Sequence, residues 1–258
     1  MKISVLGAGN VGSHLARALS GVGHSVAVWN RSEAALALLR REVGIKCCTD
    51  LKELPKDTEI YLIAVKDDAV AAVAQRLADA LGKTNAIVAH TAGSLPKSVL
   101  DGCFEYTGVF YPMQTFSRDK VLEYSNISFF VEEQDDMLHR LAQTISPKVF
   151  SLTTEQRKVL HLASVFACNF TNHCYAIAAD LLNGINVPFA TLQPLINETA
   201  AKVNDLSPRE AQTGPAQRED YGIMKSQSRM LDDKPNWQKI YNCMSDSIIK
   251  HKHDNDRL

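Results

Sequence analysis

The chain opens with MKISVLGAGNVG, in which a short apolar segment runs directly into Gly7, Gly9 and Gly12. A strand that turns into a helix within three residues needs a positive φ, which Gly7 adopts at little steric cost. Gly9 keeps a side chain out of the turn, and Gly12 lets the helix pack closely against the strand. This spacing predicts a strand, a tight glycine turn and a helix that begins near Asn10.

The segment GHSVAVWN, at 23–30, predicts a second strand and completes a βαβ unit. The start of a helix in such a unit points unpaired N–H groups and the positive end of the helix dipole at a phosphate. We therefore expect the loop, with Ala8, Asn10 and Val11 between its glycines, to hold the pyrophosphate of a dinucleotide. The spacing and its context disfavour the alternative, a chance glycine-rich turn.

The second strand ends in Trp29, Asn30, Arg31 and Ser32, where an NAD site usually carries an acidic residue for the ribose 2'-OH. A carboxylate would repel a 2'-phosphate, whereas Arg31 can pair with it through two N–H groups and Ser32 can donate its hydroxyl. The sequence therefore favours NADP(H) over NAD(H). Alternatively, Arg31 is a solvated surface residue and Ser32 only the N-cap of the next helix.

Composition bounds the class of protein. The 258 residues are 45% hydrophobic and carry a formal charge of -1, which is ordinary for a globular protein of two domains. We expect no nucleic-acid partner, no membrane segment, a cytoplasmic location and, because the six cysteines lack metal-ligand spacing, free thiols and no metal site.

Strand and helix patterns alternate up to about residue 152. Buried apolar segments such as EIYLIAV and NAIVAH are separated by helical patterns, which indicates an α/β fold with a doubly wound, mostly parallel Rossmann sheet. Beyond this point the pattern is helical throughout, starting with one long helix over 154–183 and continuing over 188–204, 217–231 and 236–251. We predict a nucleotide-binding domain at 1–152 and a smaller all-α domain at 153–258.

Ligands of open parallel sheets lie beyond the C-terminal ends of the strands. Ala64, Val65 and Thr91 occupy such ends and are expected to line the cofactor site. His90 closes an apolar strand there, where it is either a proton carrier or, more commonly for such a histidine, a hydrogen-bonded structural residue. Asp68 is interpreted as the N-cap of the following helix.

A polar stripe runs down the predicted long helix. At about 100° per residue, Lys158, His161, Val165, Asn169 and Asn172 fall within an arc of about 80°. Because buried unpaired polar groups are costly, the stripe must face water, a polar network or a ligand. A catalytic cleft and an internal network between helices remain equally open.

The segment QTGPAQRED is a third cluster. Thr213 and Gly214 precede a charged turn, which is typical of a helix start. The functional alternative makes Arg218 a clamp for a substrate carboxylate or phosphate.

These segments carry a resemblance that covers nearly the whole chain. MKISVLGAGNVGSHLA with WNRS resembles the N-terminal domain of deazaflavin-dependent NADP oxidoreductases and pyrroline-5-carboxylate reductases. HTAGSLP, VFYPMQTFS, HLASVFACNF and QTGPAQRED together resemble bacterial Rossmann-like proteins with a helical C-terminal domain of unknown function. The resemblance implies an NADP oxidoreductase related to the 6-phosphogluconate dehydrogenase group that dimerises through its helical domain.

The wider hydroxyacid dehydrogenases carry a lysine and an asparagine four residues apart on the corresponding helix. In this chain Leu162 follows Lys158 at that spacing, so the motif is broken. His161 as acid/base with Asn169 orienting the substrate is a substitute that rests on helix geometry alone.

The sequence therefore favours an NADP(H)-dependent oxidoreductase that transfers hydride to or from a small carbonyl, imine or hydroxy acid in a cleft between its domains. His161 is the preferred proton carrier, with Lys158 and then His90 as alternatives.

Apolar helical segments such as YAIAADLL, too numerous for a small domain to bury, predict a homodimer. The competing class is a non-catalytic NADP-binding sensor or assembly module. The sequence names neither the substrate nor the direction of the reaction.

Overall fold

The computed structural model describes residues 1–117 and 120–255. By its internal contacts the chain divides into two units, Met1–Cys168 and Asn169–Leu258, which are called the sheet unit and the helical unit below. The division falls later than the boundary at 152 that the sequence suggests. Among the described residues, no helix is both long enough and apolar enough to cross a membrane.

Eight strands form one sheet in the order β3-β2-β1-β4-β5-β6-β7-β8. All neighbouring strands are parallel except β6 and β7, which are antiparallel, so the predicted doubly wound, mostly parallel sheet is confirmed. The strands are β1 (Lys2–Leu6), β2 (Ser25–Trp29), β3 (Lys46–Cys48), β4 (Ile60–Ile63), β5 (Ile87–His90), β6 (Thr107–Met113), β7 (Ser128–Glu132) and β8 (Val149–Ser151).

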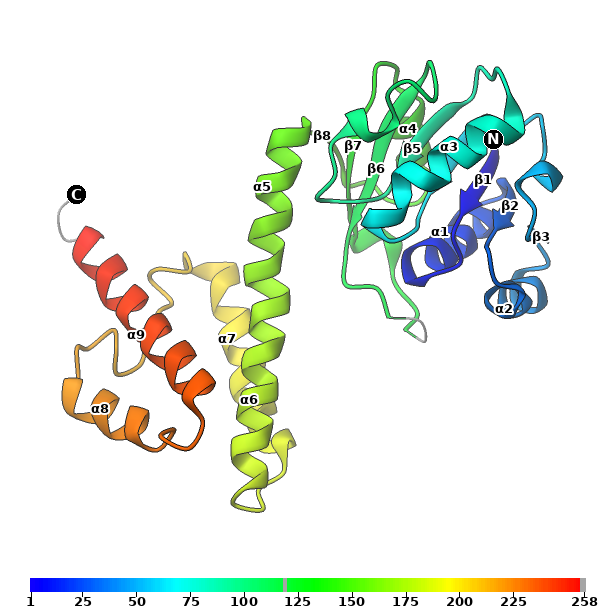
Figure 1. Ribbon diagram of the computed structural model, residues 1–258. Coiled ribbons are helices and arrows are strands. Elements are labelled where there is room, and N and C mark those ends of the chain that lie inside the picture. The colour runs from blue at the N-terminus through cyan, green and yellow to red at the C-terminus, as the bar shows by residue number, and fades with distance from the viewer. Residues whose placement is uncertain (118–119, 256–258) are drawn as a thin grey trace. The chain divides into compact units, whose positions relative to one another are not determined.

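Helices cover both faces of the sheet (Figure 1). Successive side chains of a strand point to opposite faces, so Ile3 and Val5 of β1 join one apolar cluster and Leu6 joins the other. The first cluster includes side chains of α1, α2 and α4, and the second includes those of α3. These helices are α1 (Asn10–Gly21), α2 (Glu33–Val43), α3 (Val70–Leu81) and α4 (Met137–Gln143).

The start of α3 differs from the prediction. A 3-10 turn, Asp67–Ala69, precedes the helix, and Ala69 rather than Asp68 is its N-cap residue. The backbone N–H of Ala69 donates to the carbonyl oxygen of Lys66, 2.9 Å away, so this turn occupies the place where a side-chain cap would act. The prediction of Asp68 as N-cap is therefore wrong.

The predicted long helix is continuous but not uniform. It consists of α5 (Thr154–Ser164), a π-helical segment (Val165–Phe170) and α6 (Thr171–Asn183). Its start is set locally by a capping box between Thr153 and Gln156. The wider turn of the π-helical segment advances each residue by less than about 100°, so the predicted polar stripe does not continue unbroken through it.

Arg157 ties α5 to the sheet unit. Its side chain is only 1% exposed, and its guanidinium forms an ion pair with Glu132 at the end of β7, with Nη1 2.5 Å from Oε2. The same guanidinium donates to the carbonyl oxygen of Leu95, in the loop after β5. These contacts explain why α5 groups with the sheet rather than with the helices that follow.

The helical unit contains α6, α7 (Gln193–Asp205), α8 (Tyr221–Arg229) and α9 (Pro235–Asn255). The α8 helix begins four residues later than predicted, because Asp220 accepts a hydrogen bond from the backbone N–H of Ile223 and so acts as its N-cap. In the described part of the helical unit, the buried apolar side chains are those of Ala216 and Leu231.

Candidate functional site

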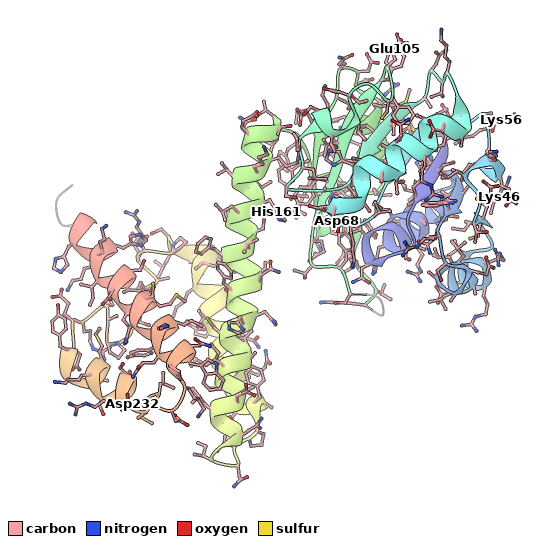
Figure 2. The ribbon with its side chains drawn as sticks, in the orientation of Figure 1. Lys46, Lys56, Asp68, Glu105, His161 and Asp232 are labelled. Carbon is pink, nitrogen blue, oxygen red and sulfur yellow. The ribbon has the colours of Figure 1, made fainter. Side chains whose placement is uncertain are left out.

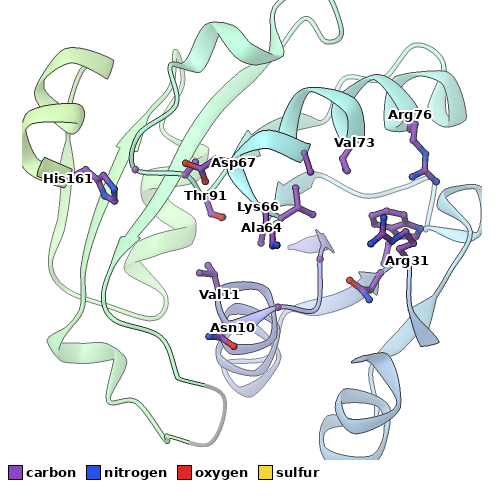
Figure 3. A pocket seen from close by; sticks show the side chains of 18 residues that line it. Asn10, Val11, Arg31, Ala64, Lys66, Asp67, Val73, Arg76, Thr91 and His161 are labelled. Carbon is purple, nitrogen blue, oxygen red and sulfur yellow. The ribbon is translucent and has the colours of Figure 1, made fainter. Parts of the chain in front are cut away.

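A cavity of about 670 Å³ lies in the sheet unit, along the C-terminal ends of β1, β2, β4 and β5 (Figure 3). This is the edge at which open parallel sheets bind ligands. Nine of the residues assigned to the cofactor by sequence line it, namely Gly7, Gly9, Asn10, Val11, Asn30, Arg31, Ala64, Val65 and Thr91.

The three glycines of the first turn have the physical roles that the motif predicts. Gly7 has a φ of 119°, and a Cβ at this position would lie 2.3 Å from the carbonyl oxygen of Ala64. A Cβ at Gly12 would lie 2.0 Å from the carbonyl oxygen of Gly7, so the absence of a side chain lets α1 pack close to the turn. A Cβ at Gly9 would meet no atom within 4 Å, so Gly9 borders open space in the cavity wall. The turn thus leaves room for a phosphate group beside the first turn of α1.

Ala8, Gly12 and Ser32 do not line this cavity. The backbone N–H of Ala8 donates to the side-chain oxygen of Asn30, 3.1 Å away, and the amide nitrogen of Asn30 donates to the carbonyl oxygen of Ser32. Asn30 therefore links the glycine turn to the end of β2. Ser32 is the N-cap residue of α2 but makes no side-chain capping bond.

One end of the cavity carries two guanidinium groups, those of Arg31 and Arg76 (Figure 3). Arg31 follows β2, and Arg76 comes from the middle of α3, with its guanidinium carbon 5.4 Å from the centre of the Trp29 ring. Both arginines are exposed, and Trp29 is buried. Sequence reasoning missed Arg76, because an arginine on the polar face of a helix is typical of any solvated surface.

The other end is formed by the loop after β5 and by His161 on α5 (Figure 3). His161 lies on the side of α5 that faces the sheet (Figure 2). Its Nδ1 atom is 3.2 Å from the hydroxyl oxygen of Tyr111 on β6, and the two rings meet edge to face. The Nε2 atom has no hydrogen-bond partner among the described residues. Tyr111 is absent from the sequence-based candidates.

His90 is placed differently from His161. Its side chain is fully buried, Nδ1 accepts from the backbone N–H of Ala92, and Nε2 lies 3.3 Å from the carbonyl oxygen of Pro96. Burial lowers the pKa of His90 to about 4, with a further contribution from the charge of Arg157. A neutral ring with both nitrogens occupied favours the structural alternative over proton transfer.

Lys158 and Asn169 are both exposed and do not line this cavity, and Asn169 belongs to the helical unit. Arg218 is also exposed, in a turn that leads into α8. Of the predicted catalytic set, the structure brings only His161 to the cavity.

Two further cavity residues follow β4. Asp67 accepts a hydrogen bond from the hydroxyl of Ser94, which joins the loop after β4 to the loop after β5. Lys66 adds a third cationic side chain to the wall, between the two ends (Figure 3). Both residues belong to the loop AVKDD, whose composition alone does not indicate which side chains face a ligand.

Two family models match separate parts of the chain. Residues 2–93 match the family described as NADP oxidoreductase coenzyme F420-dependent, and residues 127–248 match a domain of unknown function, DUF2520. Glycerol-3-phosphate dehydrogenase [NAD(P)+] from Thermoanaerobacter sp. (strain X514) is 34% identical over 114 residues. That match covers 39% of this chain and only 34% of the dehydrogenase.

Solved structures extend the likeness over the whole chain. A reductive aminase from Aspergillus terreus, in complex with NADPH and ethyl levulinate, has a TM-score of 0.75 but 15% identity, covering 98% of this chain and 94% of its own, so it shares the fold. A protein from Bacteroides fragilis, described as a "putative NADP oxidoreductase", is 42% identical with a TM-score of 0.90, covering 96% of this chain and 98% of its own. The chain therefore belongs to the same NADP oxidoreductase family as the Bacteroides fragilis protein.

Proposed function

We propose that this protein transfers hydride between NADP(H), bound in the cavity of the sheet unit, and a small carbonyl, imine or hydroxy acid beside His161. The observation that carries the proposal is one continuous cavity with two unlike ends. Its wall joins the glycine turn to a pair of arginines on one side and to a histidine on the other. Its volume of about 670 Å³ is within the range of small-molecule sites.

Arg31 and Arg76 would hold the 2'-phosphate of the cofactor. A guanidinium binds a phosphate through two parallel N–H donors, and two guanidiniums from different elements can contact different oxygens of one phosphate. The Gly9 backbone and the first turn of α1 would hold the pyrophosphate. Thr91 and the loop after β5 would then border the nicotinamide. The cofactor supplies or accepts the hydride when bound.

His161 would hold the proton that accompanies the hydride. When a carbonyl or imine is reduced, a His161 ring protonated at both nitrogens donates its Nε2 proton to the oxygen or nitrogen that gains electron density and becomes neutral; in the reverse direction the unprotonated Nε2 of the neutral ring accepts the proton. The reacting carbon is thus proposed to lie beside His161 within the sheet unit. The sequence had placed the substrate between the domains, with Lys158 or Asn169 taking part. Neither side chain lines the cavity, so we assign them no role in the reaction.

We also propose that the helical domain forms a homodimer. Several large apolar side chains of the helical unit are exposed, including Ile185 at 66%, Leu195 at 63% and Met230 at 76%. Exposed apolar side chains gathered in a small unit are typical of a surface that another chain covers. A second copy of this chain is the occupant we propose, because isologous dimers are the commonest assembly of soluble proteins.

Cofactor specificity tests the cationic end of the cavity. Titration of protein fluorescence with NADPH and NADH should give at least about tenfold tighter binding of NADPH, or about 1.4 kcal/mol. Arg31→Ala and Arg76→Ala should each remove most of this preference, while Arg41→Ala, on α2 and outside the cavity, should not. Equal affinities for the two cofactors in the unmodified protein would contradict the assignment.

Turnover tests the class of protein. The purified protein should oxidise NADPH with a member of a panel of small keto acids, aldehydes and imines. His161→Ala should then lower kcat about a hundredfold or more and leave NADPH affinity nearly unchanged. Tight NADPH binding without turnover on any member of the panel would instead support the competing class, a non-catalytic NADP-binding sensor or assembly module.

A further inference from the structure

Three segments that are distant in sequence converge on one hydrogen bond at the His161 end of the cavity. Tyr111 comes from β6 and His161 from α5, and their side chains meet at 3.2 Å between the hydroxyl oxygen and Nδ1. Gly93, in the loop after β5, lies directly against both rings. Of the three residues, His161 and Gly93 line the cavity and Tyr111 does not.

The missing side chain of Gly93 is what allows this approach. A Cβ at Gly93 would lie 2.7 Å from Nδ1 of His161 and 2.8 Å from Cζ of Tyr111, both closer than such atoms pack. The φ of Gly93 is not positive, so its backbone does not itself require glycine. The requirement is therefore steric, and the space that it preserves is filled by the Tyr111–His161 pair.

The chemistry of the two groups sets the direction of the hydrogen bond. A phenol is a stronger acid than a neutral imidazole N–H, and an imidazole nitrogen is a stronger base than a phenol oxygen, so the hydroxyl donates to Nδ1. Burial raises the pKa of Tyr111, which keeps the O–H protonated and able to donate. With Nδ1 occupied as an acceptor, the single hydrogen of a neutral His161 ring lies on Nε2.

We propose that Tyr111 is the positioning partner of His161: its hydroxyl holds the ring through Nδ1 so that Nε2 is presented to the cavity, in the space that Gly93 leaves open. This inference rests on the proposed function, in which His161 gives and takes a proton at Nε2. In the ring that gives the proton, both nitrogens are protonated, and the hydroxyl of Tyr111 has turned to accept from Nδ1–H. Loss of the Nε2 proton leaves a neutral ring whose hydrogen lies on Nδ1, still donated to Tyr111, and the bare Nε2 is the acceptor for the reverse step. The ring therefore keeps the same partner and orientation before and after proton transfer.

The test is a comparison of the imidazole nitrogen resonances of His161 in full-length protein labelled with ¹⁵N-histidine. In the unmodified protein at a pH where the ring is neutral, Nδ1 should resonate as an unprotonated, hydrogen-bonded nitrogen and Nε2 as a protonated one. Tyr111→Phe should shift the Nδ1 resonance toward that of an acceptor without a partner and increase the fraction of the other tautomer. Tyr124→Phe is the matched control, because the Tyr124 hydroxyl is buried elsewhere in the sheet unit.

Gly93→Ala provides a second variant that leaves both partners intact. The added methyl group should push the rings apart and shift the same resonances in the same direction. Unchanged His161 resonances in Tyr111→Phe, or equal changes in Tyr124→Phe, would overturn the proposal independently of any measurement of enzyme activity.

Kinetics separates this inference from the proposed function. With a substrate from the panel, Tyr111→Phe should lower kcat about tenfold, with KM and NADPH affinity within about twofold of the unmodified protein. A positioning role is rejected if kcat does not change although the His161 resonances do. Full activity of His161→Ala would instead reject His161 as the proton carrier. The His161 resonances of the unmodified protein and of Tyr111→Phe would still report on the Tyr111–His161 hydrogen bond.

Discussion

The sheet unit and the helical unit differ in how completely each encloses its own apolar side chains. In the sheet unit, helices cover both faces of the sheet and two apolar clusters are fully buried. In the helical unit, Ala216 and Leu231 are buried, while larger side chains such as Leu195 and Met230 are mostly exposed. The sheet unit can therefore hold its cavity by its own packing, whereas the helical unit leaves large apolar side chains exposed.

Two tryptophans allow the units to be followed separately. Trp29 lies at the end of β2, and Trp237 lies on α9. The chain contains no other tryptophan. Replacing either one by phenylalanine leaves a single fluorophore that reports on the unfolding of one unit, and this pair of variants is used below.

The largest expected effect concerns the anchor of α5 in the sheet unit. Arg157→Ala should lower the free energy of unfolding of this unit by about 3 to 5 kcal/mol, because it leaves the Glu132 carboxylate without the cation that it pairs with. Urea denaturation followed by Trp29 fluorescence measures this. The control is Arg140→Ala, which removes an exposed ion pair with Asp136 and should cost no more than about 0.5 kcal/mol. Similar losses in the two variants would mean that α5 is not held by this contact.

The second prediction addresses the helical unit. If a second copy covers its apolar side chains, hundredfold dilution should lower its apparent free energy of unfolding by about 2.7 kcal/mol per mole of dimer, by mass action. Trp237 fluorescence in urea at several protein concentrations measures the shift. The Trp29 signal should change less. A Trp237 transition that does not depend on concentration, together with a monomer mass in sedimentation, would contradict the dimer.

Acid should weaken the sheet unit through His90. The folded-state pKa of about 4 is below the ordinary value of 6.5, so between these values the unfolded chain binds more protons and stability falls as the pH falls. From pH 7 to pH 5 the expected loss from this group is about 2 kcal/mol. His90→Gln should be less stable at pH 7 but lose correspondingly less on acidification. If the variant and the unmodified protein lost the same free energy of unfolding between pH 7 and pH 5, His90 would not be the group responsible.

The smallest expected effect is at Tyr124. Its hydroxyl is buried without a hydrogen-bond partner among the described residues, and burial raises its pKa. Tyr124→Phe should therefore leave the free energy of unfolding unchanged or raise it by up to about 1 kcal/mol. A loss above about 1 kcal/mol, measured by Trp29 fluorescence in urea, would show that the hydroxyl has a partner after all.

Much of the sheet unit follows from local sequence patterns. The glycine turn, the apolar strands and the start of α2 depend on backbone conformation and periodicity, which nearby residues determine. The direction of β7 does not, because an apolar strand reads the same in both orientations and only its partner across a long loop sets the pairing. The π-helical segment could not be predicted either, because VFACNF contains no glycine or proline that would mark a change in the helix.

The candidate site was predictable where it lies on the glycine motif and at the C-terminal ends of the strands. His161 was predicted because a polar stripe on an otherwise apolar helix must face water, a polar network or a ligand. Its actual partner, Tyr111, lies fifty residues away on an interior strand, where a tyrosine is ordinary. Arg76 is similar: its helix position predicts exposure, and only the packing of α3 on the sheet brings it beside Arg31. Contacts between distant elements depend on the assembled sheet, so one element's pattern does not reveal them.

The strand order also determines when β1 can complete its pairing during synthesis. The first strand, β1, lies between β2 and β4, so half of its backbone hydrogen-bonding groups find no partner until Ile60–Ile63 has left the ribosome. The glycine turn gains a neighbour at the same stage, because the carbonyl oxygen of Ala64 occupies the space where a side chain of Gly7 would lie. Domains fold as units, N-terminal first, during synthesis. The cavity wall therefore stays incomplete in the nascent chain until residues 60–64 have been synthesised, and a pause in translation before β4 would prolong that interval.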